Sequence, residues 1–102
     1  MYIEFKTNKL KKCCENEKPR KRTWSEEIGK KLVQRLNEIV AAPNLRALKQ
    51  VRSAKCHELE KDRKGQYAVK LTGNYRLIFK PVGETIEAQV IRVKILEVGD
   101  YH

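Results

Sequence analysis

The chain has two histidines, and their side chains are the first candidates for proton transfer. His57 lies in a loosely alternating segment, and His102 is the last residue, directly after Asp100 and Tyr101. Imidazole titrates near neutral pH, so two histidines that meet could act as general acid and general base. A single histidine is more often a surface or core residue, and a terminal one can be a frayed chain end. Acid–base chemistry is therefore predicted for the pair rather than for either residue alone.

A cationic side chain follows a tight turn in the second half of the sequence. Arg76 comes just after Thr72-Gly73-Asn74, on the strand face opposite Tyr75 and Leu77. The planar guanidinium of arginine can clamp a phosphate, although a solvated strand arginine is an equally good interpretation. Three further cations lie in a turn close to His57 in sequence: Lys61, Arg63 and Lys64.

The cysteines argue against a metal or thiol centre. Cys13 and Cys14 are adjacent, Cys56 adjoins His57, and no pair has the two-residue gap of a zinc site. Cys56 could serve as a nucleophile, but cysteine is more often a small buried hydrophobe. The sequence also lacks the common glycine-rich phosphate loops. We therefore expect no metal and no nucleotide cofactor.

The charge balance predicts an acidic partner. The chain carries 23 Lys and Arg against 13 Asp and Glu, for a net charge of +10, and most of the excess lies in the N-terminal half. Nucleic acid is the leading candidate and an acidic protein the second, while lysine-rich helices that are simply well solvated remain an alternative. The N-terminal cations singled out are Lys9, Lys11, Lys12, Arg20, Lys21 and Arg22.

The length and hydropathy of the chain predict its number of domains and its location. With 102 residues and a mass of 12.0 kDa, the chain is expected to form one domain over residues 1–102. No apolar run approaches the ~20 residues that a membrane span needs, and no signal-peptide stretch opens the chain. We expect a cytoplasmic protein with no membrane contact.

The N-terminal half predicts one strand and two helices. Residues 2–6 alternate like a short strand, and residues 9–18 form a weak helix that Pro19 ends, followed by a basic connection. Residues 23–26 form a capping box with Thr23 as the cap. Apolar residues then recur at helical spacing from Trp24 to Val40. One short turn follows at residues 45–50.

The C-terminal half predicts a meander of strands. Residues 54–60 alternate loosely, residues 66–71 and 75–79 alternate clearly, and Thr72-Gly73-Asn74 joins the last two as a hairpin. The last apolar stretch changes phase between residues 90 and 91, which predicts a bulge or a loop before the strand. The resulting order is β-α-α-β-β-β, an α+β fold with two helices on a twisted, mainly antiparallel sheet.

Three ordered motifs resemble the HigB toxins. Residues 57–67 resemble their H-x-L-x-G-D-R-x-G-x-(W/Y) segment, residues 74–79 their N-(W/Y)-R-(L/I)-x-F strand, and residues 100–102 their terminal D-Y-H. HigB toxins belong to the RelE-like superfamily of type II toxin–antitoxin systems and are also known as plasmid-maintenance killer proteins. Two positions depart from the pattern: Lys61 replaces the usual glycine, and Gly99 stands where a bulkier residue is common.

The resemblance implies a RelE-like fold and a ribosome-dependent mRNA endonuclease that needs no metal. It also implies a HigA-like helix-turn-helix antitoxin, through which alone the toxin would reach operator DNA. In such cleavage the ribose 2′-hydroxyl attacks the adjacent phosphorus and expels the 5′-oxygen, which requires a base, an acid and cations.

The same resemblance assigns a functional set to this sequence. His57 and His102 would transfer protons, with their individual roles open, and Asp100 would orient a histidine or share in proton transfer. Tyr101 would stack on or orient a base, and Arg76 would hold the scissile phosphate. Lys61, Arg63 and Lys64 would add positive potential, and the basic helices would dock on ribosomal RNA.

Two other functions remain open from the sequence. A non-catalytic ribosome- or RNA-binding module on the same fold would use the charge without the histidines. A protein-binding module would use the charge only for an acidic partner.

Overall fold

The computed structural model describes residues 1–100, so the predictions for Tyr101 and His102 lie outside the described residues. Five strands and four α-helices form within this range, joined by three short 3₁₀ helices. The elements are β1 (Tyr2–Phe5), α1 (Asn8–Glu15), α2 (Glu17–Thr23), α3 (Glu26–Ala41), α4 (Leu45–Leu48), η1 (Arg52–Ala54), β2 (His57–Glu58), η2 (Lys61–Arg63), β3 (Tyr67–Lys70), β4 (Tyr75–Pro81), η3 (Glu87–Gln89) and β5 (Arg92–Asp100).

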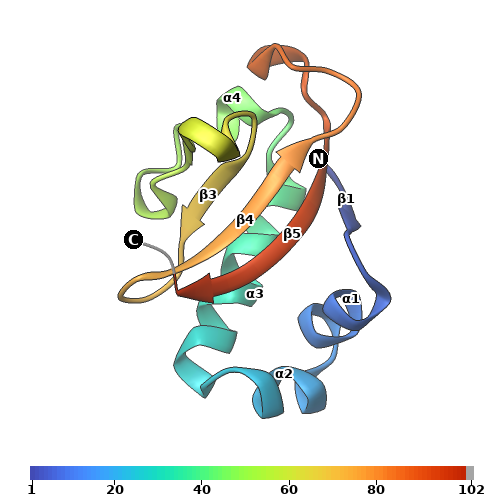
Figure 1. The fold of residues 1–102 in the computed structure, drawn as a ribbon, viewed down its shortest axis with the longest axis vertical. Coiled ribbons are helices and arrows are strands. Elements are labelled where there is room, and N and C mark those ends of the chain that lie inside the picture. Colours follow the sequence, from blue (N-terminus) through green and yellow to red (C-terminus); the bar gives the residue numbers. More distant parts are fainter. Residues whose placement is uncertain (101–102) are drawn as a thin grey trace.

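The strands form one sheet in the order β1-β5-β4-β3-β2. β1 pairs with β5 in parallel, and all other pairs are antiparallel. Figure 1 shows α3 lying behind the sheet, while the face of β4 and β5 toward the viewer is the opposite one. The expected α+β class and mainly antiparallel sheet are confirmed.

The main core lies between α3 and the helix-covered face of the sheet, which we call the helix face. Leu32 and Ile39 of α3 are fully buried in it. The strands contribute the alternating residues Tyr67, Val69, Leu77, Phe79, Val93 and Ile95. Tyr67 and Phe79 are directly opposite in β3 and β4, and their rings stack with centroids 5.9 Å apart. The period-two pattern of the sequence thus identified the buried face correctly.

The expected helix over residues 9–18 is confirmed in its first part, but its extent and its end at Pro19 are wrong. α1 ends at Glu15, and Pro19 is the third residue of α2, so the basic connection is itself helical. A proline in the first turn removes only an N–H that has no partner within the helix, which is why the helix tolerates it. The number of helices is therefore larger than the two expected.

The capping box at Thr23 is also wrong. Ser25 caps α3 by accepting a hydrogen bond from the Ile28 backbone N–H at 3.2 Å. Thr23 instead ends α2, where its hydroxyl donates to the Pro19 carbonyl at 2.8 Å. The cap moves by two residues because α2 occupies the residues that the box needed.

The change of phase before the last strand comes from the segment that precedes the strand, and a separate bulge lies further along β5. Residues 87–89 form η3, and β5 begins only at Arg92. Within β5, Ile95 pairs with Phe79 but Glu97 pairs with Ile78, so Leu96 is an extra residue in a bulge. The loosely alternating residues 54–60 give only the two-residue strand β2, at the edge of the sheet.

Candidate active site and nucleic-acid interface

The face of the sheet away from α3, here called the open face, carries two of the predicted site residues, His57 and Arg76. His57 is paired with Ala68, Ala68 with Ile78, and Ile78 with Glu97, so these four residues form one row across β2, β3, β4 and β5. Directly paired residues share a face of a sheet. His57 and Glu97 therefore lie at the two ends of a row on the open face.

His57 is exposed and has one defined hydrogen-bond partner. Its Nδ1 lies 3.0 Å from the Lys55 carbonyl oxygen. When Nδ1 carries the proton, it donates to this carbonyl, and Nε2 is left to accept a proton from another group. The local backbone thus favours the tautomer that a general base needs.

Arg76 lies on the same face, nearer the end of β5. It is opposite Lys70 on one side and Gly99 on the other, and its Nη1 donates to the Gly73 and Tyr75 carbonyls, both at 2.9 Å. A Cβ placed on Gly99 would meet no atom within 4 Å, so there is open space beside this arginine. The backbone opposite this arginine is therefore not covered by other residues of the 1–100 range.

The open face brings His57 and Arg76 together only loosely. They are two strands and two residues apart, which places their Cα atoms about 12 Å from each other by the spacing of a sheet. Asp100 is exposed and opposite Tyr75 at the end of β5, one residue beyond Gly99. The segment that continues to Tyr101 and His102 therefore starts beside Arg76.

In the turn between β2 and β3, Lys61 replaces the usual glycine of the motif but adopts a backbone conformation that glycine favours. Lys61 has φ 56°, in the left-handed region, and its side chain is exposed together with that of Lys64. A side chain in this conformation costs about 1 kcal/mol, which explains why glycine is usual at this position of the motif. Arg63 is only partly exposed, because its Nε donates to Gln66 at 2.9 Å and its Nη1 lies 3.0 Å from Glu97.

The N-terminal cations form a separate region. They lie on the α1–α2 hairpin (residues 8–23), which packs next to β1, whereas His57 and the 61–64 turn lie at the β2 edge (Figure 1). Lys9, Lys12 and Arg22 line one surface hollow of about 400 Å³. The predicted RNA-binding residues therefore divide into two groups at opposite edges of the sheet.

The hairpin cations are not equivalent. Lys9, Lys11, Lys12 and Arg22 are exposed. Lys21 is also exposed but pairs with Glu17 at 2.9 Å. Arg20 is half-buried, packs over Gly29 of α3, and donates to the Cys14 carbonyl at 3.2 Å. Arg20 thus joins α2 to its neighbours, a role that its sequence context did not reveal.

The cysteines are buried parts of the core. Cys13, Cys14 and Cys56 are free thiols, each at most 7% exposed. Burial raises the pKa of the Cys14 and Cys56 thiols to about 12, so both stay protonated at neutral pH. A protonated, buried thiol is a poor nucleophile, which argues against the catalytic role considered for Cys56.

Residues 1–100 offer neither a cluster of metal-binding side chains nor a membrane-spanning helix. No group of three or more His, Cys, Asp or Glu side chains within this range could hold a metal ion. None of the helices in it has both the length and the apolar composition that a membrane crossing requires.

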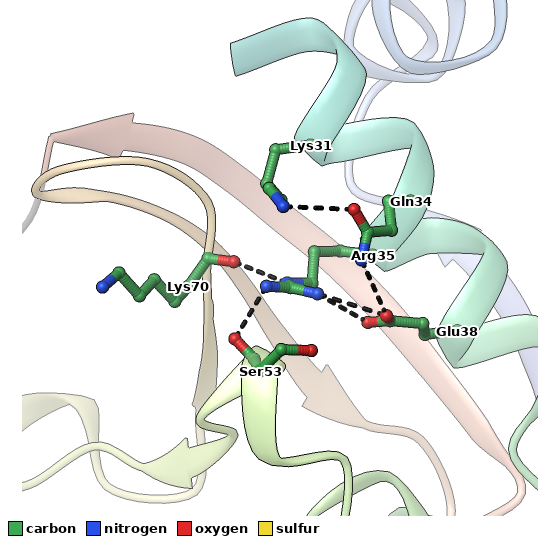
Figure 2. A network of polar contacts seen from close by, with 6 residues as sticks. All are labelled: Lys31, Gln34, Arg35, Glu38, Ser53 and Lys70. Carbon is green, nitrogen blue, oxygen red and sulfur yellow. Dashed lines mark hydrogen bonds and ion pairs between the residues drawn. The ribbon is translucent and has the colours of Figure 1, made fainter. Parts of the chain in front are cut away.

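Arg35, in the middle of α3, has a structural role that the sequence pattern did not reveal. Arg35 is only 3% exposed. As Figure 2 shows, its guanidinium reaches three segments. Nε donates to the Lys70 carbonyl at 2.6 Å, Nη2 to the Ser53 carbonyl at 2.7 Å, and Nη1 to Glu38 at 2.9 Å. The residue ties α3 to η1 and to the end of β3, the segments on either side of His57.

The fold is that of the RelE-like toxins. The chain is similar over its full length to a YoeB–YefM complex from Staphylococcus aureus, with 16% identity, a TM-score of 0.63 and 97% of that chain covered. It is also similar over its full length to a YoeB/ParE toxin from Agrobacterium tumefaciens, with 11% identity, a TM-score of 0.57 and all of that chain covered. A search of curated proteins gives no match.

The family follows from the sequence match. Residues 3–93 match the model of the HigB-like toxins, RelE-like toxins of the type II toxin–antitoxin system HigB, and the chain belongs to this family. The resemblance carried by the motifs is thereby confirmed. The matched range includes His57, Arg76 and both basic regions, and it ends before Asp100.

Proposed function

We propose that this toxin is a ribosome-dependent mRNA endonuclease, an mRNA interferase that inhibits translation by cleaving mRNA in the ribosomal A site. The observation that carries the proposal is the open face, where His57 and Arg76 lie on one surface and β5 ends beside Arg76. Membership of the HigB-like family supports the same function.

The reaction needs no metal. The 2′-oxygen forms a bond to the adjacent phosphorus as the bond to the 5′-oxygen breaks, leaving a cyclic phosphate and a 5′-hydroxyl. His57, with Nδ1–H held by the Lys55 carbonyl, offers Nε2 as one proton-transfer group, and His102 is the other. Arg76 neutralises charge on the phosphorane, and Asp100 and Tyr101 orient the histidine and the base.

The two basic regions bind ribosomal RNA. A ribosome presents RNA phosphates over a much larger area than a single active site, and cations at both edges of the sheet can contact it together. Lys61 and Lys64 lie on the His57 side, and the hairpin cations lie on the other. The net charge of +10 supports such a partner.

The proposal includes an antitoxin. A HigA-like helix-turn-helix protein would neutralise the toxin, and operator DNA would be contacted only through it. The type II toxin–antitoxin family supports this partnership, as does the structural neighbour solved as a complex of YoeB with YefM. Such a pair would act in the cytoplasm and contribute to plasmid maintenance.

The test is primer-extension mapping of mRNA breaks in cells that briefly express the wild type, His57→Ala or His102→Ala. We expect in-frame breaks with the wild type and at least about a hundredfold loss, the lower end of what one acid–base group contributes, with either variant. Growth arrest without breaks in any strain would overturn the nuclease and favour a non-catalytic ribosome-binding module, which the two basic regions also suit.

A further inference from the structure

An ion pair crosses the open face beside the proposed site. Arg63, at the end of η2, reaches Glu97 on β5 with an Nη1–Oε1 distance of 3.0 Å. The two side chains are 30% and 50% exposed, so the pair is accessible to a ligand from solvent. β3 and β4 lie between β2 and β5, so the contact reaches across these two strands from the turn after β2 to β5.

The bulge in β5 is what places Glu97 there. Ile95 pairs with Phe79 on the helix face, and strict alternation would put Glu97 on that face as well. Because Leu96 is an extra residue, Glu97 instead pairs with Ile78 and is turned to the open face. The carboxylate thus ends up in the same cross-strand row as His57.

An apolar cluster occupies the middle of that row. Ala68 and Ile78 are buried together with Leu59, and Leu96 packs against them. These residues bring no charge to the strip between His57 and Glu97. The Arg63–Glu97 pair is a charged contact next to this strip, and a bound phosphate would meet it there.

We propose that Glu97 is an internal counterion that competes with an RNA phosphate for Arg63. The inference rests on the proposed function. A guanidinium binds carboxylate and phosphate with the same planar fork, so Arg63 can exchange one for the other without refolding the turn. Arg63 then positions RNA on the open face, and Glu97 weakens the binding of every RNA by holding Arg63 in the unbound state.

The size of the effect follows from the exposure of the pair. Ion pairs this exposed contribute at most about 1 kcal/mol, which corresponds to a factor of about five in a dissociation constant. We therefore expect Glu97→Gln, which keeps the size of the side chain but removes its charge, to tighten RNA binding by about fivefold at low salt. In a protein with a net charge of +10, competition from Glu97 lowers the affinity of Arg63 for any RNA phosphate.

The experiment measures fluorescence anisotropy with a short single-stranded RNA whose 2′-hydroxyls are methylated, so that it cannot be cleaved. Four proteins are compared: wild type, Glu97→Gln, Arg63→Gln and the double variant. Thermal melts establish that each is folded. We expect Glu97→Gln to bind about fivefold tighter, Arg63→Gln to bind more weakly, and Glu97→Gln to change nothing further once Arg63 is replaced.

Glu84→Gln is the matched control. Glu84 is exposed in the segment after β4, at the far end of that strand from Arg76, and its substitution changes the net charge equally. We expect less than about a twofold effect, because salt screens separated charges.

Other outcomes overturn the inference in distinguishable ways. Equal tightening by Glu97→Gln with and without Arg63 would show a general charge effect. Unchanged or weaker binding by Glu97→Gln would show that the pair only holds the turn. In both cases RNA still binds and the nuclease proposal stands, whereas no binding by any variant at low salt would count against both.

Discussion

Lys61 shows how one residue can retain a family's backbone while changing its side chain. Its φ of 56° is a conformation that L side chains rarely adopt. Lys64, three residues later, has φ −56° and no such conflict. The two lysines are both exposed and carry the same charge, so they form a natural comparison.

We predict that Lys61→Gly stabilises the protein by about 1 kcal/mol, since glycine relieves the left-handed conformation. Urea unfolding measures the change. Lys64→Gly, the control, should instead lose about 0.5 kcal/mol, because glycine there only adds freedom to the unfolded chain. Destabilisation of similar size by both substitutions would contradict this explanation of the turn.

The buried thiols give stability a defined dependence on alkaline pH. The pKa of Cys14 and of Cys56 is raised by burial from 9.0 to about 12, so the folded state retains protons that the unfolded state releases above pH 9. Stability must then fall as pH rises through this window. We predict a loss of about 3 kcal/mol in the free energy of unfolding between pH 8 and pH 10, measured by chemical denaturation at each pH.

The double variant Cys14→Ala/Cys56→Ala is the control for that prediction. It should be less stable at every pH but show a flatter profile than the wild type over the same interval. Parallel profiles of the two proteins would mean that other groups, such as lysines and tyrosines, cause the alkaline loss.

At the scale of elements, α3 organises the site through Arg35. Its guanidinium donates to backbone carbonyls of Ser53 and Lys70, and these lie on segments that precede and follow His57. Removing the side chain takes this donor from two part-buried carbonyls and its cation from Glu38. Losing these hydrogen bonds and this ion pair lowers the free energy of unfolding far more than losing a surface ion pair does.

We predict that Arg35→Ala destabilises the protein by about 3 kcal/mol in urea unfolding. Arg46→Ala, which removes an exposed arginine of α4, should change stability by less than about 0.5 kcal/mol. If the two variants were equally stable, Arg35 would contribute no more to stability than an exposed arginine. Its hydrogen bonds would then not stabilise the segments on either side of His57.

At the scale of the whole molecule, charge is distributed over two regions separated by the sheet. The α1–α2 hairpin (residues 8–23) has seven Lys or Arg against two Glu, and the 61–64 turn adds three cations at the other edge. An extended polyanion such as ribosomal RNA can contact both regions at once, and loss of either should weaken its binding.

We predict that replacing Lys9, Lys12 and Arg22 by Glu lowers ribosome co-sedimentation at least about tenfold near 0.1 M salt. These residues surround one hollow of the hairpin. The control replaces Lys30, Arg46 and Arg52, exposed cations outside both regions, and changes the net charge by the same amount. Equal loss in both triple variants would show that only total charge matters.

Much of this arrangement could be predicted from local patterns. Alternation identified β3, β4 and their buried face, helical spacing identified α3, and three motifs identified the family. These features depend on residues close together in sequence, where side-chain periodicity and turn chemistry act directly. The α2 helix and the Ser25 cap were missed because Pro19 and Thr23 allow more than one local structure.

The sequence by itself determined the α+β class, the family and the types of residue available for chemistry. Only the tertiary structure decided which of them share a surface: His57, Arg76 and Glu97 on the open face, Arg35 in the interior, and the cations at two edges. Strand pairing and the β5 bulge determine the face of the sheet on which each side chain lies, since a shift of one residue moves every later side chain to the other face.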